Sequence, residues 1–263
     1  TVEIFIMKKY FFAWVISVML GLTPLAHAQN AAMVRVAAAS DLKFALEELS
    51  ARYEKQTGQN ITLVFGSSGQ FTTQILQGAP FQIFMSADEN FVYKLSDAGK
   101  TTDRGKVYAI GRIGVFTPNG SPLKADGSLK DLAASLQDGR LQKLAIANPE
   151  HAPYGERAKQ VLQNAGLWSA VQSKLILGEN ISQAAQFTLS GSAQVGIIAQ
   201  SLAVAPAFAD KGRFDLIDAK NHQPLIQRMV LIKPVSAAAQ LFYDYLGSAP
   251  AQAVLSRYGF AMP

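Results

Sequence analysis

The sequence contains no cysteine among its 263 residues. Disulfides, thiolate nucleophiles and thiolate metal ligands are therefore excluded. We also expect no lipid anchor of the lipoprotein type, because that anchor is attached to a cysteine. The fold must be stabilised by packing, and a composition of 49% hydrophobic and 16% charged residues is typical of a globular protein.

Histidine is scarce, and the usual motifs of enzymes are missing. Of the three histidines, His27 lies in the leader described below, which leaves His151 and His222, too few for a histidine-rich metal site. We interpret His151 as a loop-bracing residue. The stretch Gly66-Ser67-Ser68-Gly69 places a glycine one position too early for the serine elbow of hydrolases. Phosphate-loop and dinucleotide fingerprints are also absent. We therefore predict no enzyme, no cofactor and no metal held directly by side chains.

Basic residues are in slight excess but do not cluster. The formal net charge is +5, and no run of lysine or arginine marks a nucleic-acid footprint. A mild positive field can steer an anionic solute, and it can equally be ordinary solubility charge. We expect no nucleic-acid partner.

The N-terminal segment has the order of a secretory signal peptide. Met7, Lys8 and Lys9 form a basic start, the apolar run 10–22 follows, and Ala26-His27-Ala28 is a small-x-small cleavage pattern. The run is well short of the roughly 18 to 20 residues that span a bilayer. We predict removal of residues 1–28, with 1–6 interpreted as a misplaced translation start, and export to the periplasm.

Apolar runs alternate with amphipathic stretches, which is typical of an α/β protein with largely parallel sheets. Leu42, Leu46, Leu49 and Tyr53 share one helical face, for example. Strands are predicted at 33–38, 61–65, 81–85, 112–117, 143–147, 174–177, 195–199 and 228–232.

The order of these segments predicts two lobes with a cleft between them. A turn-rich stretch follows the strand near residue 117, which suggests a first crossing into a second lobe, and the strand near 228 is the return. The expected division is 29–112 with 228–263 for lobe 1, and 113–227 for lobe 2.

Four junctions share one pattern, in which a strand ends, small or hydroxylated residues follow and a helix begins. They lie at Ala39-Ser40-Asp41, Gly66 to Gly69, Pro153-Tyr154-Gly155 and Asn180-Ile181-Ser182. Ligands of open α/β sheets bind at the carboxyl ends of strands. Helix N-termini present unpaired N–H groups and a partial positive charge, so four of them could hold an anion without lysine or arginine. Each serine is also an ordinary helix cap, and only the combination favours a ligand site.

Several stretches resemble the periplasmic molybdate-binding proteins of ABC transporters, a family with the type II periplasmic-binding-protein fold. The resemblance covers essentially all of the chain after the leader. Its main stretches are Val36-Ala-Ala-Ala-Ser-Asp41, Phe65-Gly-Ser-Ser68, Phe84-Met-Ser-Ala-Asp88, Asn148-Pro-Glu-His-Ala-Pro-Tyr-Gly155, Gly178-Glu-Asn-Ile181 and Val195-Gly-Ile-Ile198. The fold implied is two-lobed, each lobe a mixed sheet flanked by helices, with the ligand in the cleft.

The resemblance also implies the residues that hold the oxyanion. From lobe 1 these are Ser40 by hydroxyl and amide, Asp41 by its amide, Ser68 by hydroxyl and amide, and Ser67. From lobe 2 they are the main-chain N–H groups of Tyr154 and Ile181.

Three positions depart from the family's usual pattern. Many members have a ligand-contacting tyrosine where this chain has Ala199, and we hypothesise that the hydroxyl of Tyr154 replaces it. Asp41 places a carboxylate one residue from the anion, and we expect it to point to solvent. Asn148 stands where the family usually has aspartate.

The implied mechanism is closure of the lobes over molybdate or tungstate, two ions of nearly equal size, followed by delivery to an inner-membrane permease. The protein is expected to be a monomer. Sulfate would be rejected by size, and protonated phosphate because the site consists of donors. The alternatives are a binding protein for sulfate or an organic acid, a sensing domain, and a secreted α/β hydrolase.

Overall fold

The computed structural model describes residues 33–263. The segment assigned to a signal peptide lies outside the described residues. Within residues 33–263, no helix has the length and hydrophobicity needed to cross a membrane.

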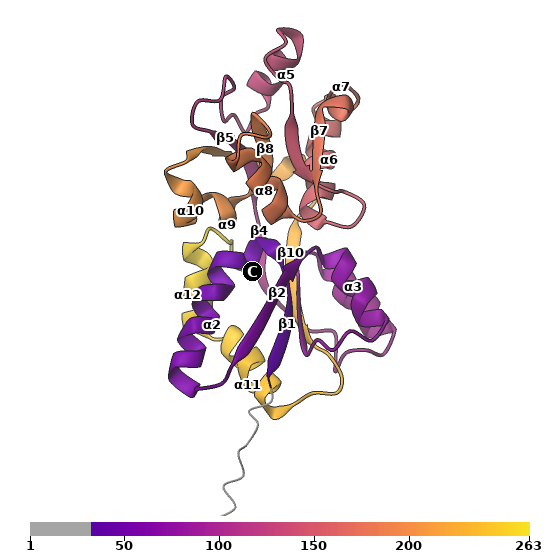
Figure 1. The fold of residues 1–263 in the computed structure, drawn as a ribbon. Coiled ribbons are helices and arrows are strands. Elements are labelled where there is room, and N and C mark those ends of the chain that lie inside the picture. Colours follow the sequence, from indigo (N-terminus) through magenta and orange to yellow (C-terminus); the bar gives the residue numbers. More distant parts are fainter. Residues whose placement is uncertain (1–32) are drawn as a thin grey trace, which may run out of the picture. The chain divides into compact units, whose positions relative to one another are not determined.

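Two five-stranded mixed sheets organise the chain (Figure 1). The first has the order β2-β1-β3-β10-β4, in which β1, β2 and β3 are parallel and β10 is antiparallel to its neighbours β3 and β4. The second has the order β7-β6-β8-β5-β9 and the same plan, with β6, β7 and β8 parallel and β5 antiparallel to β8 and β9. The expected two-lobed fold with mixed sheets is confirmed. We call the first sheet with its helices lobe 1 and the second lobe 2.

The strands of lobe 1 are β1 (Val34–Ala39), β2 (Ile61–Gly66), β3 (Ile83–Ser86), β4 (Lys106–Gly111) and β10 (Leu225–Leu231), and those of lobe 2 are β5 (Ile113–Pro118), β6 (Leu144–Ala147), β7 (Leu175–Gly178), β8 (Val195–Ala199) and β9 (Gly212–Leu216). All eight predicted strands overlap a strand of the structure, but β4 and β9 were missed. β9 is an edge strand with mostly exposed residues such as Arg213 and Asp215, so it lacks the apolar run that marks a buried strand.

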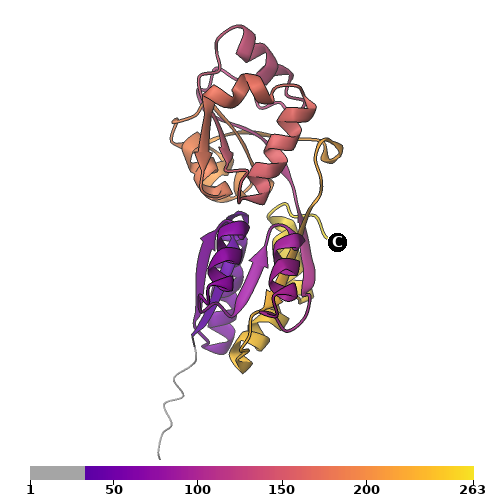
Figure 2. The same ribbon diagram turned by 90° about the vertical axis from the view of Figure 1, so that its right-hand side faces the viewer.

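Helices cover both faces of the first sheet (Figures 1 and 2). Phe242 and Leu46 lie in the core under one helical layer, and Phe71 and Val92 in the core under the other. The first layer comprises α2 (Lys43–Thr57), α11 (Ala237–Leu246) and α12 (Ala249–Arg257), and the second α3 (Ser68–Leu76) and α4 (Glu89–Asp97). A short 3₁₀ helix, η1 (Ser40–Leu42), joins β1 to α2.

Lobe 2 has its own hydrophobic core, which includes Ile146, Val161, Ala184 and Ile197. Its helices are α5 (Lys130–Gln137), α6 (Pro153–Asn164), α7 (Trp168–Val171), α8 (Ile181–Leu189), α9 (Gln200–Ala203) and α10 (Pro206–Ala209), with the 3₁₀ helices η2 (Gln172–Lys174) and η3 (Ala219–Asn221).

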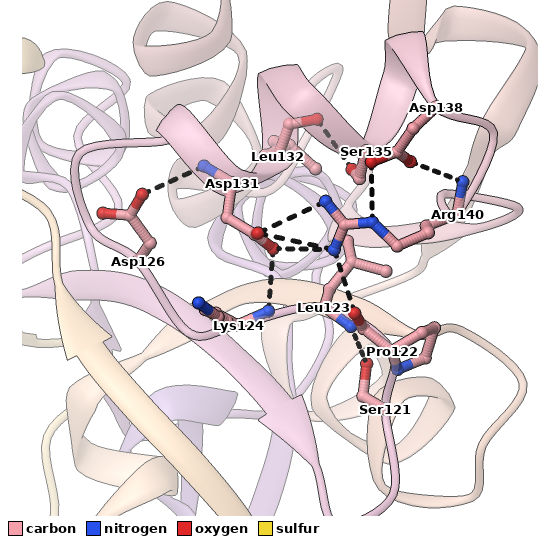
Figure 3. A network of polar contacts seen from close by, with 10 residues as sticks. All are labelled: Ser121, Pro122, Leu123, Lys124, Asp126, Asp131, Leu132, Ser135, Asp138 and Arg140. Carbon is pink, nitrogen blue, oxygen red and sulfur yellow. Dashed lines mark hydrogen bonds and ion pairs between the residues drawn. The ribbon is translucent and has the colours of Figure 1, made fainter.

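A polar network secures the turn-rich segment that precedes α5 (Figure 3). The guanidinium of Arg140 donates to the carbonyl of Pro122 at 2.9 Å and to the carboxylate of Asp138 at 2.8 Å. Asp131 accepts from the main-chain N–H of Lys124 at 2.8 Å. These contacts bridge the loop and both ends of α5, so they order the periphery of lobe 2 without touching the site described next.

Candidate functional site

The four predicted junctions meet around one small cavity. The last residues of β1 and β2 are paired, Ala39 with Gly66, and the last residues of β6 and β7 are paired, Ala147 with Gly178. Each lobe therefore brings two strand ends side by side, and a helix follows each end: η1, α3, α6 and α8. All six residues of the predicted site line the cavity, whose lining comprises Ala39, Ser40, Asp41, Gly66, Ser67, Ser68, Ala87, Ala152, Pro153, Tyr154 and Ile181.

The cavity suits a small ion better than an organic molecule. Its volume is about 10 Å³, whereas pockets for organic ligands usually measure about 300 to 1,000 Å³. Its lining includes serine hydroxyls and the first residues of α3, α6 and α8. The N–H groups at a helix start lack partners within the helix and favour negative charge.

Ser40 and Ser68 are held so that their hydroxyl protons stay available. The oxygen of Ser40 accepts a hydrogen bond from the main-chain N–H of Ser182 at 3.2 Å, and that of Ser68 accepts from the N–H of Ala87 at 3.0 Å. Both serines are at most 2% exposed. A hydroxyl that accepts from the backbone still has its own proton to donate, so each of them can donate to an anion in the cavity.

Ser67 is the cap of α3. Its hydroxyl accepts from the N–H of Gln70 at 3.3 Å and shares a 2.9 Å hydrogen bond with Nδ1 of His151 from lobe 2. The carbonyl of His151 also accepts from the N–H of Gly69 at 3.0 Å. The bracing role predicted for His151 is confirmed, and the brace runs between the lobes.

Lobe 2 presents main-chain groups at two helix starts. Ile181 is the first residue of α8, whose cap Asn180 accepts from the N–H of Gln183 at 3.1 Å. Tyr154 follows Pro153 at the start of α6. A side chain at Gly155 would place its Cβ 2.1 Å from the carbonyl oxygen of Ala147. Glycine therefore lets α6 begin directly against the end of β6.

The hydroxyl of Tyr154 has a different partner from the one we expected. It donates to Oδ2 of Asp41 at 2.8 Å and accepts from Nε2 of Gln227 at 3.0 Å. Its single proton is committed to the carboxylate, so the hydroxyl cannot donate to an oxyanion at the same time. The hypothesis that it replaces a missing ligand hydroxyl is therefore wrong for this arrangement. Ala199 is fully buried at the end of β8 and does not line the cavity.

Asp41 does not point to solvent, and that expectation is wrong. The residue is 1% exposed. Its Oδ2 accepts from Tyr154 and, at 2.6 Å, from Nε2 of Gln227, while Oδ1 is buried without a hydrogen-bond partner. Desolvation by burial raises the pKa of Asp41 from 3.8 to about 6, although the hydrogen bonds from Gln227 and Tyr154 oppose the rise.

Gln227 and Tyr108 belong to this site environment and were not predicted from the sequence. The hydroxyl of Tyr108 donates to Oε1 of Gln227 at 2.7 Å, which orients the amide so that Nε2 faces Asp41. Gln227 is fully buried in a strand of mainly apolar residues. A polar residue at a buried position of an apolar strand is the signal that could have identified it.

Further polar contacts join the lobes around the cavity. Arg157 of α6 forms a 2.6 Å ion pair with Asp88, the cap of α4, and both side chains are less than 10% exposed. Gln70 donates to Glu179 at 2.7 Å. Ser182 donates its hydroxyl to the carbonyl of Ser40 at 2.8 Å. The lobes are therefore in direct contact at the cavity.

Within residues 33–263, no group of three or more histidine, aspartate or glutamate side chains is placed to hold a metal ion.

The known proteins that this chain resembles are solute-binding proteins. The family model of bacterial extracellular solute-binding proteins matches residues 34–261. A molybdate-binding protein ModA of Azotobacter vinelandii is 34% identical over 93% of this chain and 96% of its own length. One of Rhodobacter capsulatus is also 34% identical, over 86% and 87%. The solved structure of the Azotobacter vinelandii periplasmic molybdate-binding protein superimposes with a TM-score of 0.79 at 29% identity, covering 88% of this chain and 99% of that one.

Proposed function

This chain belongs to the family of bacterial extracellular solute-binding proteins, and from that premise we propose that it captures molybdate or tungstate in the periplasm and delivers the ion to an ABC transporter permease. The observation that carries the proposal is the convergence of four strand-to-helix junctions on one small cavity. The names of the relatives point to molybdate. The proposal includes removal of residues 1–28 and the lobe division 29–112 with 228–263, and 113–227, whose second boundary falls inside β10 of the first sheet.

In the proposed complex, the ion is bound through its oxygens by neutral donors. The hydroxyls of Ser40 and Ser68 accept from main-chain N–H groups and can donate their own protons, and the N–H groups of Ser40, Asp41, Ser68, Tyr154 and Ile181 lie at the starts of helices. Ser67 contributes by fixing the start of α3 against His151. Hydrogen bonds to a charged partner contribute about 1.5 to 3 kcal/mol each. Six of them exceed the roughly 8 kcal/mol of micromolar binding before the cost of ordering is subtracted.

Neutral donors in fixed positions also explain why the site would select molybdate over other anions. Donors held by buried main chain at four helix starts move little, so they reach an ion of the right diameter better than a smaller one such as sulfate. An organic acid would require more space than the cavity offers. Tungstate nearly matches molybdate in size, so both should bind.

One observation favours a hydrolase as a second candidate. His151 contacts both Ser67 and Glu179, with Ser67 Oγ 2.9 Å from His151 Nδ1 and His151 Nε2 3.5 Å from Glu179 Oε2. However, the Ser67 oxygen already caps α3, and the side chain of Glu179 is 62% exposed, so the carboxylate does not fix the ring as a catalytic triad requires. We therefore assign no enzymatic activity. Turnover of ester substrates that disappears in Ser67→Ala would reverse this assignment.

Calorimetric titration of the purified protein with molybdate, tungstate, sulfate and phosphate tests the proposed function. We expect micromolar or tighter binding of the first two ions and at least about 100-fold weaker binding of sulfate, equivalent to about 2.7 kcal/mol. Binding of sulfate in preference to molybdate, or of none of the four ions, would contradict the proposal.

A further inference from the structure

A buried carboxylate lies in the lining of a cavity proposed to hold a doubly charged anion. Asp41 is adjacent to Ser40, one of the proposed donors, and both residues line the cavity. Oδ2 of Asp41 accepts two hydrogen bonds from neutral groups, and Oδ1 has no partner. A negative charge at this position would oppose the anion that the serine hydroxyls and helix starts attract, because repulsion between like charges is strong away from water.

No cation compensates the carboxylate among the described groups that face it. Tyr154 from α6, Tyr108 from β4 and Gln227 from β10 surround it. The neighbouring β2, α8 and α9 carry no ionisable side chain. Cations on the adjacent elements have other contacts: Lys43 lies 5.8 Å from the centroid of the Phe44 ring, and Lys106 lies 4.3 Å from that of Tyr243. Arg157 is paired with Asp88, and Arg228 with Glu89. Burial and the charge of Asp41 hold the pKa of both tyrosines well above their usual value, so neither phenol adds negative charge.

We propose that this protein binds its oxyanion together with one proton, which Asp41 takes up from solvent as the cavity fills and returns when the ion leaves. This inference rests on the proposed function, because it requires an anion in the cavity. The proton converts the carboxylate into a neutral carboxylic acid, which removes the repulsion. It also gives the carboxyl group an O–H donor, which the ionised form lacks.

Proton linkage determines how the affinity for the anion changes with pH. Desolvation already places the pKa of Asp41 at about 6, so the empty protein has an ionised Asp41 at neutral pH and above. An anion in the cavity raises that pKa further. Between the two values, binding consumes a proton, and the dissociation constant rises by up to about tenfold for each pH unit. Below the pKa of the empty protein, Asp41 is already neutral and this dependence ends.

Calorimetry of molybdate binding in two buffers with different enthalpies of ionisation, such as Hepes and Tris, measures the proton directly. At about pH 7.5 we expect uptake of about one proton per molybdate in the parent protein. In Asp41→Asn we expect no uptake and a dissociation constant that no longer varies with pH. At about pH 8 the variant should bind up to about 100-fold more tightly than the parent. The parent must protonate Asp41 at a pH about two units above the pKa of that group, and the variant avoids this cost.

A second variant identifies the group that takes up the proton. His151 is a second ionisable side chain near the cavity, through its contact with Ser67, and His151→Gln keeps a hydrogen-bonding group there. We expect this variant to take up the proton as the parent does. Uptake that persists in Asp41→Asn and vanishes in His151→Gln would overturn the inference.

Measurements on the parent protein alone distinguish the proton-linked mechanism from the proposed function, even if Asp41→Asn does not fold. Tight molybdate binding with equal apparent enthalpy in both buffers, and a dissociation constant independent of pH from about 6.5 to 8.5, would overturn the proton-linked mechanism and leave the proposed function intact. Absence of molybdate binding at every pH, including about pH 5.5 where Asp41 is mostly neutral, would instead contradict the proposed function.

Discussion

Replacing Asp41 by asparagine should stabilise the empty protein at high pH. Burial raises the pKa of this carboxyl from 3.8 to about 6 in the folded chain, so folding favours the protonated form. A raised pKa in the folded state contributes stability that is complete below about pH 3.8 and is lost as the pH rises through about 6. Above that range the ionised carboxylate costs about 3 kcal/mol, at 1.36 kcal/mol per pKa unit.

Asparagine has a similar shape and keeps an oxygen that accepts from Tyr154 and Gln227, but it carries no charge. Without ligand at about pH 8, we expect Asp41→Asn to be about 3 kcal/mol more stable than the parent, which corresponds to a rise of about 6 to 12 °C in Tm for a protein of this size. The gain should fall to about half near pH 5 and nearly vanish below pH 4.

Thermal unfolding followed by circular dichroism across this pH range measures the effect. Asp210→Asn is the matched control, since Asp210 is exposed and its replacement should change Tm little at any pH. Equal Tm values for Asp41→Asn and the parent at pH 8, or a gain that grows as the pH falls, would refute the reasoning.

Three further substitutions probe the cavity and the contact between the lobes. Ser68→Ala removes a hydroxyl donor and should weaken molybdate binding about 10- to 100-fold in calorimetry; unchanged affinity would show that the Ser68 hydroxyl only accepts from the N–H of Ala87. Gly69→Ala would place a Cβ 2.6 Å from the carbonyl oxygen of His151, so it should weaken binding at least about tenfold by holding the lobes apart, and it should also lower the Tm because the contacts between the lobes are strained. Asp88→Asn removes the buried carboxylate that pairs with Arg157 and leaves its guanidinium only the half-exposed Glu156 as an ion-pair partner, so it should cost about 3 to 5 kcal/mol in urea unfolding; a loss below about 1 kcal/mol would show that Glu156 and solvent compensate the charge.

The fold could be predicted from the sequence because the patterns that indicate its strands and helix ends are local. Buried parallel strands appear as apolar runs, and Gly58 ends α2 with a φ of 71°, a conformation that favours glycine. The junction residues Ser40, Ser68, Tyr154 and Ile181 could be placed at helix starts for the same reason. β9 was missed because an exposed edge strand carries no comparable pattern.

The environment of Asp41 could not be predicted, because it depends on contacts distant in the sequence. Gln227 lies 186 positions from Asp41, and Tyr154 lies 113 positions from it. Near a helix start, a carboxylate at the surface is the ordinary expectation. Only the packing of α6 and β10 against η1 shows that this side chain is enclosed and that the hydroxyl of Tyr154 is turned toward it.

A crystal structure of the protein with tungstate tests the central claim most directly, because the anomalous signal of tungsten locates the ion without assumptions about its ligands. Our account predicts one strong peak in the cavity, with the ion's oxygens within about 3 Å of the hydroxyls of Ser40 and Ser68 and the main-chain nitrogens of Tyr154 and Ile181. A peak elsewhere on the protein, with the cavity empty at saturating tungstate, would contradict the account.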